Sequence, residues 1–175
     1  MSGRGGVASP RVLGLIAAAL TLLVDQAHKL WMLNVYDIAA RQPVRVGPFL
    51  DLVMAWNPGI SYSLLSAETE AGRWALLALA LTATAALGVW MWRAPHWAAA
   101  LGLGFIVGGA LGNAYDRYAY GKVADFFLLH IDTERWGRIN WYVFNLADVA
   151  IVAGVVLLLS DSSFVKEAAK PAAEV

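Results

Sequence analysis

Residues 97–125 read WAAALGLGFIVGGALGNAYDRYAYGKVAD, and this stretch decides the fold. Its first 19 residues carry no charge, which is close to the ~20 residues that a helix needs to cross a bilayer. Gly104, Gly108 and Gly112 recur at four-residue spacing, so one face of the helix is small and allows a neighbouring helix to approach closely. The stretch then becomes polar and ends in Asp125. It therefore predicts a membrane-spanning helix that leads directly into a polar segment.

The whole chain has the composition of an integral membrane protein. Of its 175 residues, 59% are hydrophobic and 15% are charged, with a mean hydropathy of +0.58, whereas soluble domains are about 45–50% apolar and about 25% charged. Basic and acidic residues balance at 13 each, without a basic run or zinc-finger spacing, which excludes a nucleic-acid-binding protein. The chain has no cysteine, and its three histidines lack ligand spacing. We therefore expect no metal and no cofactor.

Three more apolar segments give the chain four predicted membrane spans. Residues 12–33 and 144–160 form the first and last spans, and residues 74–92 and 97–115 form the middle two. Only a short turn separates the middle spans, so we expect them to pair as a helical hairpin. The sequence thus predicts an all-α polytopic membrane protein, with four transmembrane helices in a single membrane domain.

Two longer polar regions separate the spans. Residues 34–73 follow the first span and contain two short runs rich in β-branched and apolar residues, 44–46 and 49–56, punctuated by proline and glycine. This pattern predicts short strands, and hence a small β-rich platform outside the membrane. Residues 117–143 separate the last two spans, and we expect a loop there.

Four spans place both chain termini on one side of the membrane and both polar regions on the other. The terminal side carries five lysines and arginines and the other side carries seven, so a simple count opposes a cytoplasmic N-terminus. The positive-inside rule gives most weight to the first helix, and Arg4 and Arg11 precede that helix with no acidic residue between them. We therefore predict that both termini are cytoplasmic.

Two groups of polar residues lie inside or next to the predicted spans. Asp25 and Lys29 are four residues apart and share a helix face, which predicts an ion pair that neutralises both charges, or a contact at the mouth of a site. Asn113, Asp116 and Arg117 form the pattern GNxxDR at the end of the third span. Arginine stays protonated and is suited to holding a carboxylate. We therefore interpret Asp116 and Arg117 as scaffolding.

Asp125 and Asp148 are candidates for a catalytic pair. Asp125 lies in the apolar run KVADFF and Asp148 in FNLAD at the start of the fourth span, where it or Asn145 could also cap the helix. Two close carboxylates do not both ionise readily, so they share a proton. One then acts as a base that activates water, and the other as an acid that polarises a carbonyl. This is the chemistry of aspartic proteases.

The residues alone leave two other functions open. Ion-coupled carriers also place carboxylates within the membrane, so a small proton-coupled transporter or transporter subunit is one alternative. It predicts a polar path to both membrane faces, whereas the middle spans have almost no polar residues in their cytoplasmic halves. A non-enzymatic membrane scaffold that assembles through the glycine face is the other alternative, and it leaves Asp125 and Asp148 without a role.

The motifs together are more specific than any one of them. The chain carries, in this order, Asp25-x-x-x-Lys29, Asn57-x-Gly59, GGALGNAYDR at 108–117, VADFF at 123–127 and FNLAD at 144–148. Over about residues 12–160 it resembles the lipoprotein signal peptidases, or bacterial signal peptidase II. The resemblance implies an aspartic endopeptidase of the bacterial inner membrane that removes the signal peptide from prolipoproteins. The cut falls before the diacylglyceryl-modified cysteine of the lipobox.

The resemblance also implies roles for particular residues and partners. The catalytic pair falls on Asp125 and Asp148, near the periplasmic leaflet, with membrane lipid around the site. A globomycin-type cyclic peptide is the implied inhibitor. The remaining matched positions are expected to order the pair or to line the site: Asp25, Lys29, Asn57, Gly59, Gly109, Asn113, Asp116, Arg117, Asn145 and Ala147.

The chain departs from the family pattern in two places. Ile60-Ser61-Tyr62 stands where small residues and Phe are common, and Val123-Ala124 stands where Val-Val is common. The first departure puts the shape of the substrate groove in doubt. Asp116 competes with Asp125 for the catalytic role, and we place it second because Arg117 can hold it ionised. Glycine punctuation in the loop over 117–143 further predicts a lid.

Overall fold

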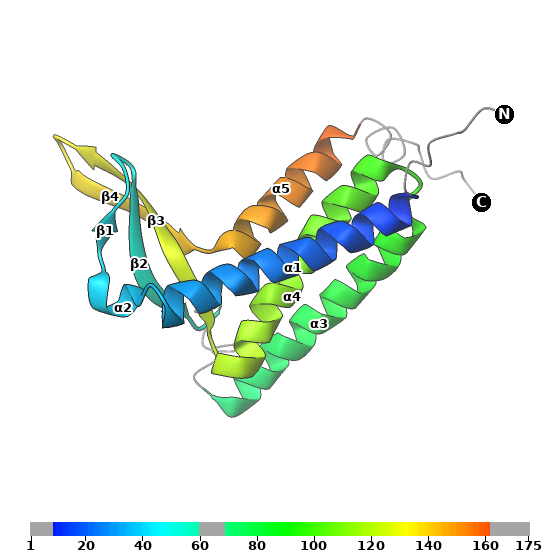
Figure 1. Ribbon diagram of the computed structural model, residues 1–175, viewed down its shortest axis with the longest axis horizontal. Coiled ribbons are helices and arrows are strands. Elements are labelled where there is room, and N and C mark those ends of the chain that lie inside the picture. The colour runs from blue at the N-terminus through cyan, green and yellow to red at the C-terminus, as the bar shows by residue number, and fades with distance from the viewer. Residues whose placement is uncertain (1–8, 60–68, 162–175) are drawn as a thin grey trace, which may run out of the picture.

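The structure is a computed structural model that describes residues 9–59 and 69–161, so that Ile60-Ser61-Tyr62 lies outside the described residues. Four long helices run side by side, and a small sheet stands at the end of the bundle opposite the two termini (Figure 1). The long helices, with the short α2, have the following bounds: α1 (Pro10–Asn34), α2 (Ile38–Arg41), α3 (Glu70–Arg93), α4 (Trp97–Tyr120) and α5 (Leu146–Ser160).

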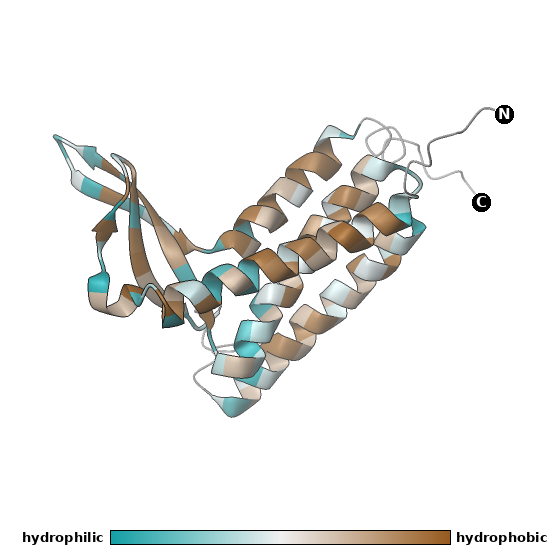
Figure 2. Cartoon of the chain, viewed as in Figure 1, coloured by the Kyte–Doolittle hydropathy of each residue, from teal (hydrophilic) through white to brown (hydrophobic). Residues whose placement is uncertain are grey.

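Three of these helices are long and apolar enough to cross a membrane. Among the described residues, α1 has 25 residues and α3 and α4 have 24 each. Helix α5 has 15 residues, which at 1.5 Å per residue is about 22 Å, shorter than the ~30 Å hydrocarbon core. Hydrophobic residues predominate along the long helices (Figure 2), and many of the large ones are exposed. The fold is therefore that of a multi-pass membrane protein with three candidate spans and a shorter apolar helix.

Helix α4 lies at the centre and packs against the other three long helices, with its glycines against α1 and α5. A Cβ atom on Gly104 or Gly108 would lie 2.5 Å from a backbone oxygen of α1. A Cβ atom on Gly109, on another side of α4, would lie 2.5 Å from the backbone oxygen of Ala147 in α5. The glycine spacing thus serves close helix packing, as predicted.

Gly108→Ala tests this packing. The added Cβ would meet the Ala18 carbonyl oxygen at 2.5 Å, so α1 must shift, and we expect a loss of about 1–3 kcal/mol in the free energy of unfolding. Gly88→Ala is the matched control, because a Cβ there has nothing within 4 Å and alanine favours the helix by about 1 kcal/mol. Thermal unfolding in detergent should show a lower Tm for the first variant only. Equal Tm values would contradict the packing.

The four strands form one antiparallel sheet in the order β1-β2-β3-β4. Strands β1 (Val44–Arg45) and β2 (Leu50–Asn57) confirm the strands predicted after the first helix. The loop predicted over 117–143 is wrong, because β3 (Val123–Thr133) and β4 (Gly137–Phe144) form a hairpin there. The first four residues of β3 are all buried, which hides its period of two. Gly137 supplies the hairpin turn with a φ of 68°.

The base of the sheet is anchored to the end of α1. Met32 and Ile38 pack with Ala124 and Phe126 of β3 in one buried cluster. Gly121 ends α4 with a φ of 76°, in the left-handed region, and turns the chain directly into β3. The first residues of β3 are therefore held close to both α1 and α4. Gly121 and Gly137 are the two glycines behind the predicted lid. Gly121 forms the turn after α4, and Gly137 forms the turn of the hairpin.

Candidate active site

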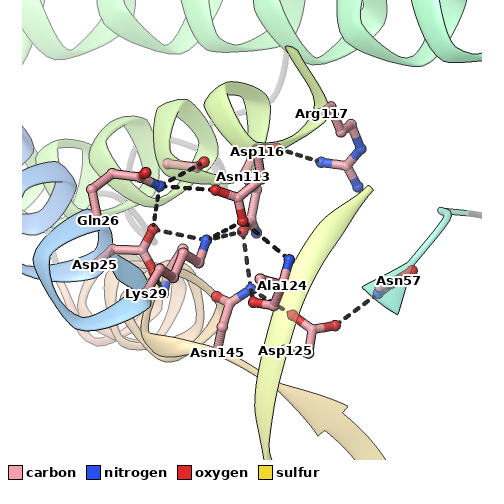
Figure 3. A network of polar contacts seen from close by, with 12 residues as sticks. Asp25, Gln26, Lys29, Asn57, Asn113, Asp116, Arg117, Ala124, Asp125 and Asn145 are labelled. Atoms are coloured by element: carbon pink, nitrogen blue, oxygen red, sulfur yellow. Dashed lines mark hydrogen bonds and ion pairs between the residues drawn. The ribbon is translucent and has the colours of Figure 1, made fainter. Parts of the chain in front are cut away.

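The two candidate aspartates come from different elements and meet through Asn145. Asp125 is the third residue of β3 and is 1% exposed, whereas Asp148 lies in the first turn of α5 and is partly exposed. The Asn145 side chain is fully buried and donates from Nδ2 to Asp125 Oδ1 over 2.6 Å (Figure 3). Its Oδ1 accepts from the Asp148 amide over 3.0 Å, and Asp148 Oδ2 accepts from the Asn145 amide over 3.1 Å. This capping box starts α5 and places Asp148 beside the end of the sheet.

Asn57 orients the other oxygen of Asp125. Its Nδ2 donates to Asp125 Oδ2 over 3.1 Å, while its Oδ1 accepts from the Gly59 amide over 2.9 Å. Gly59 has a φ of 102°, which a residue with a side chain rarely adopts. The Gly59 turn therefore fixes which end of the Asn57 amide faces the carboxylate. Asn57 and Gly59 are both among the residues that the family resemblance predicted to order the pair or line the site.

The surroundings of Asp125 favour its protonated form. Burial and, to a smaller extent, the nearby negative charge of Asp148 raise the pKa of the Asp125 carboxyl, to a net value of about 6. The hydrogen bonds from Asn57 and Asn145 stabilise the ionised form and act in the opposite direction. A carboxyl group with this pKa can exchange a proton near neutral pH.

Asn113 binds the other oxygen of the Asp148 carboxylate, and the buried Lys29 in turn contacts Asn113. Asn113 Nδ2 donates to Asp148 Oδ1 over 2.9 Å, and Lys29 Nζ lies 3.2 Å from Asn113 Oδ1. The Lys29 ammonium also lies 2.9 Å from Asp25 Oδ2 and 2.8 Å from Asp116 Oδ2. All three charged side chains are 2% exposed or less. The predicted Asp25–Lys29 ion pair is confirmed, with a second carboxylate added.

The carboxylates around Lys29 also hold the backbone ahead of each candidate aspartate. Asp116 Oδ2 accepts from the Ala124 amide over 3.1 Å, one residue before Asp125. Asp25 Oδ1 accepts from the Ala147 amide over 3.0 Å, one residue before Asp148. One buried cation thus links α1 and α4 to the backbone of both β3 and α5 (Figure 3).

The predicted partner of Asp116 is wrong. Its ion-pair partner is Lys29, whereas Arg117 donates from Nη1 to the Asn113 carbonyl over 3.2 Å. Successive residues of a helix point about 100° apart, so Asp116 faces α1 and Arg117 turns away from it. Both oxygens of Asp116 are nevertheless occupied by structural partners, namely Lys29, the Ala124 amide and Gln26.

Two residues of this site were missed in the sequence. Gln26 Nε2 lies 3.1 Å from Asp25 Oδ2, 3.1 Å from Asp116 Oδ1 and 3.2 Å from the Gly112 carbonyl. The sequence feature that could have revealed Gln26 is its polar side chain in an apolar span, next to Asp25 in the Asp25-x-x-x-Lys29 motif. Arg73 donates to the Arg117 and Tyr118 carbonyls at the end of α4. In the sequence it is the last residue of the polar region 34–73, next to the predicted span 74–92.

Glycine and alanine contribute to the site through their small size. Gly109 leaves room for the Ala147 carbonyl, and Gly112 leaves room for Asp25, whose Oδ2 would lie 2.5 Å from a Cβ. The predicted support role of Gly109 is therefore one of packing.

Over residues 9–59 and 69–161, no group of histidine and acidic side chains is arranged to hold a metal ion.

Comparison with known proteins identifies the family. The sequence profile of signal peptidase (SPase) II matches residues 17–164. The chain belongs to the signal peptidase II family. The lipoprotein signal peptidase of Methylocella silvestris is 61% identical over 156 residues, which are 89% of this chain and 88% of that protein. The lipoprotein signal peptidase of Beijerinckia indica is 57% identical over 164 residues, which are 94% of this chain and 95% of the relative.

The fold of this signal peptidase II agrees with a solved relative. A bacterial membrane enzyme structure obtained by the in meso method at 2.3 Å resolution superposes with a TM-score of 0.67. It covers 93% of both chains at 24% identity, which shows a shared fold. The resemblance seen in the motifs is confirmed, and the protein is an aspartic peptidase of the lipoprotein-processing type. The transporter and scaffold alternatives are thereby set aside.

Proposed function

We propose that this signal peptidase II removes the signal peptide from prolipoproteins by cutting before the diacylglyceryl-modified cysteine, with Asp125 and Asp148 as the catalytic pair. The observation that carries the assignment is Asn145. Its side chain donates to Asp125 over 2.6 Å, and its backbone amide donates to the Asp148 carboxylate within the capping box, so one buried residue contacts and orients both carboxylates. Asp148 is partly exposed, which leaves the pair open to water and substrate.

The proposed reaction needs one shared proton. The ionised carboxylate takes a proton from water as the oxygen attacks the scissile carbonyl, while the protonated carboxyl donates to the carbonyl oxygen. As the tetrahedral diol collapses and the C–N bond breaks, the protonated member of the pair gives its proton to the leaving amine, and the ionised member takes a proton from one hydroxyl of the diol, so the pair again holds one proton. The raised pKa of Asp125 suits a pair that holds one proton, and the proton belongs to the pair rather than to one residue.

The other matched residues position this pair. Lys29 holds Asp25 and Asp116, which in turn hold the Ala147 and Ala124 amides. Asn57 and Asn113 each bind one aspartate directly. The surroundings of Arg117 include Asp148 and Asp125, so its positive charge acts on the ionised form of the pair.

The proposed setting is the bacterial inner membrane. Helix α5 acts as a fourth, short span, and both termini are cytoplasmic. The sheet and the site lie at the opposite end of the bundle from the termini (Figure 1), which supports a site near the periplasmic leaflet. A lipidated signal helix then arrives laterally, its acyl chains remain in lipid, and water reaches Asp148 from the periplasm.

Cleavage of a defined substrate tests the function. Purified protein in detergent is incubated with a diacylglyceryl prolipoprotein, and mass spectrometry locates the cut. We expect a single cut before the lipidated cysteine, and inhibition by globomycin. The same precursor without its diacylglyceryl group is the matched control and should be cut far more slowly. Equal cleavage of both precursors, or a cut elsewhere, would contradict the proposal.

The pH profile of kcat/KM tests the environment of Asp125. The active pair holds one proton, so activity should fall as the pH rises through the Asp125 pKa of about 6. Asn57→Ala removes a hydrogen bond that stabilises the ionised carboxylate. The pKa of Asp125 should therefore rise, and the alkaline limb should move to higher pH. The control is Asn140→Ala, at an exposed amide on the distal sheet, and an unmoved limb in Asn57→Ala would contradict the assignment.

A further inference from the structure

The outer half of the β3–β4 hairpin presents an uncovered apolar face. Ile131 of β3 pairs with Ile139 of β4, and both are about half exposed, at 50% and 46%. Leu129 and Trp141 continue this face toward the base of the hairpin and are 41% and 71% exposed. With Phe49 and the buried His130, these residues line a hollow of about 280 Å³. No aspartate, glutamate, lysine or arginine is among the residues that line it.

The opposite face of the same strands carries the charges. Arg138 Nη1 lies 2.8 Å from Asp51 Oδ2, and Arg138 Nε lies 2.9 Å from Asp132 Oδ1. His130 Nε2 lies 3.3 Å from Asp51 Oδ1, and Arg45 Nη2 lies 3.7 Å from Asp132 Oδ2. Because side chains alternate along a strand, the outer hairpin is amphipathic, with its ions paired on one face and its apolar residues on the other.

The apolar face points in the same direction as the candidate site. Positions 125, 127, 129 and 131 of β3 alternate with its other residues, so Leu129 and Ile131 share a face with Asp125. The sheet extends sideways from the end of the bundle rather than along the helix axes (Figure 1). An apolar face in this position lies over the membrane surface beside the bundle.

We propose that the apolar face of the outer hairpin, Leu129, Ile131, Ile139 and Trp141, docks on the interfacial region of the bilayer that the helices span. Tryptophan is enriched at membrane interfaces, and amphipathic elements lie there with their apolar side in lipid. Trp136, 70% exposed at the hairpin turn and stacked by Arg135, extends the contact at the tip. The docking rests on the membrane fold alone and does not depend on the proposed cleavage.

Spin labels on neighbouring residues test the docking. The chain has no cysteine, so Ile139→Cys and Asn140→Cys each give one labelling site, on opposite faces of β4. The labelled full chain is placed in nanodiscs of phosphatidylcholine and phosphatidylglycerol. Relaxation by oxygen, which concentrates in lipid, is compared with relaxation by a water-soluble nickel chelate. We expect the ratio of oxygen to nickel relaxation to be several-fold higher at position 139 than at position 140.

A second label and the substrate complete the test. Ile131→Cys, on the strand opposite Ile139, should give the same high ratio, and circular dichroism checks that every variant retains its helices. Equal nickel relaxation at all three positions would overturn the proposal. So would a label at 139 that becomes shielded from nickel only when a prolipoprotein is added, because the face would then contact substrate rather than lipid.

Discussion

Asp125→Asn and Asp148→Asn are each expected to lower kcat/KM for prolipoprotein cleavage by at least about a thousandfold. A positioned acid or base contributes about 10²–10⁴-fold, and asparagine keeps the size of the side chain but does not exchange the proton. Asn145 donates to both carboxylates, from its side chain to Asp125 and from its backbone amide to Asp148, so we expect the two to act as a unit. The double variant should therefore be no more than slightly slower than either single variant.

Stability measurements separate loss of chemistry from loss of folding in these variants. The asparagine oxygen at position 125 can still accept from Asn145 or Asn57, and that at position 148 from Asn145 or Asn113, so the Tm should change by only a few degrees. Losses in kcat/KM that multiply in the double variant would contradict a shared proton. A fall in Tm that matches the loss of activity would assign both aspartates to structure instead.

Lys29→Met is expected to lower the free energy of unfolding by about 3–5 kcal/mol, the usual cost of removing one partner from a buried ion pair. The lysine is 2% exposed and lies within 2.9 Å of both Asp25 and Asp116, so its loss leaves two buried carboxylates without their cation. The Ala124 and Ala147 amides lose their fixed acceptors in turn. Cleavage should therefore fall together with Tm.

Two comparisons make the Lys29 prediction specific. Lys122→Met removes an exposed lysine and should leave Tm and cleavage almost unchanged. Adding Asp25→Asn and Asp116→Asn to Lys29→Met removes the uncompensated charge while keeping oxygens that accept from the two amides. This triple variant should regain part of the lost Tm. An unchanged Tm in Lys29→Met alone would show that the buried cation does not hold the site together.

The long apolar helices and the main ion pair were predictable from the sequence because each depends on local spacing. Uncharged runs mark the long helices, and Asp25 and Lys29 share a face by being four residues apart on one helix. The four-residue spacing of the glycines in α4 also predicted close helix packing directly.

The missed features depend on contacts between distant segments. Lys29 and Asp116 meet only when α1 packs on α4, so the adjacent Arg117 was the apparent partner in the sequence. The β3–β4 hairpin was missed because the first residues of β3 are buried on both faces, which removes the alternation that marks a strand. Gln26 bridges Asp25 and Asp116 for the same tertiary reason.

The assignment of the catalytic pair is tested most directly by comparing Asp125→Asn with Asp116→Asn. Both aspartates are buried in the same network, and the initial rate of cleavage of a diacylglyceryl prolipoprotein is measured for each folded variant. We predict no detectable turnover by Asp125→Asn and residual turnover by Asp116→Asn, which loses a support for Ala124 but keeps both catalytic carboxylates. Turnover by Asp125→Asn with none by Asp116→Asn would contradict the account and move the catalytic pair to Asp116 and Asp148.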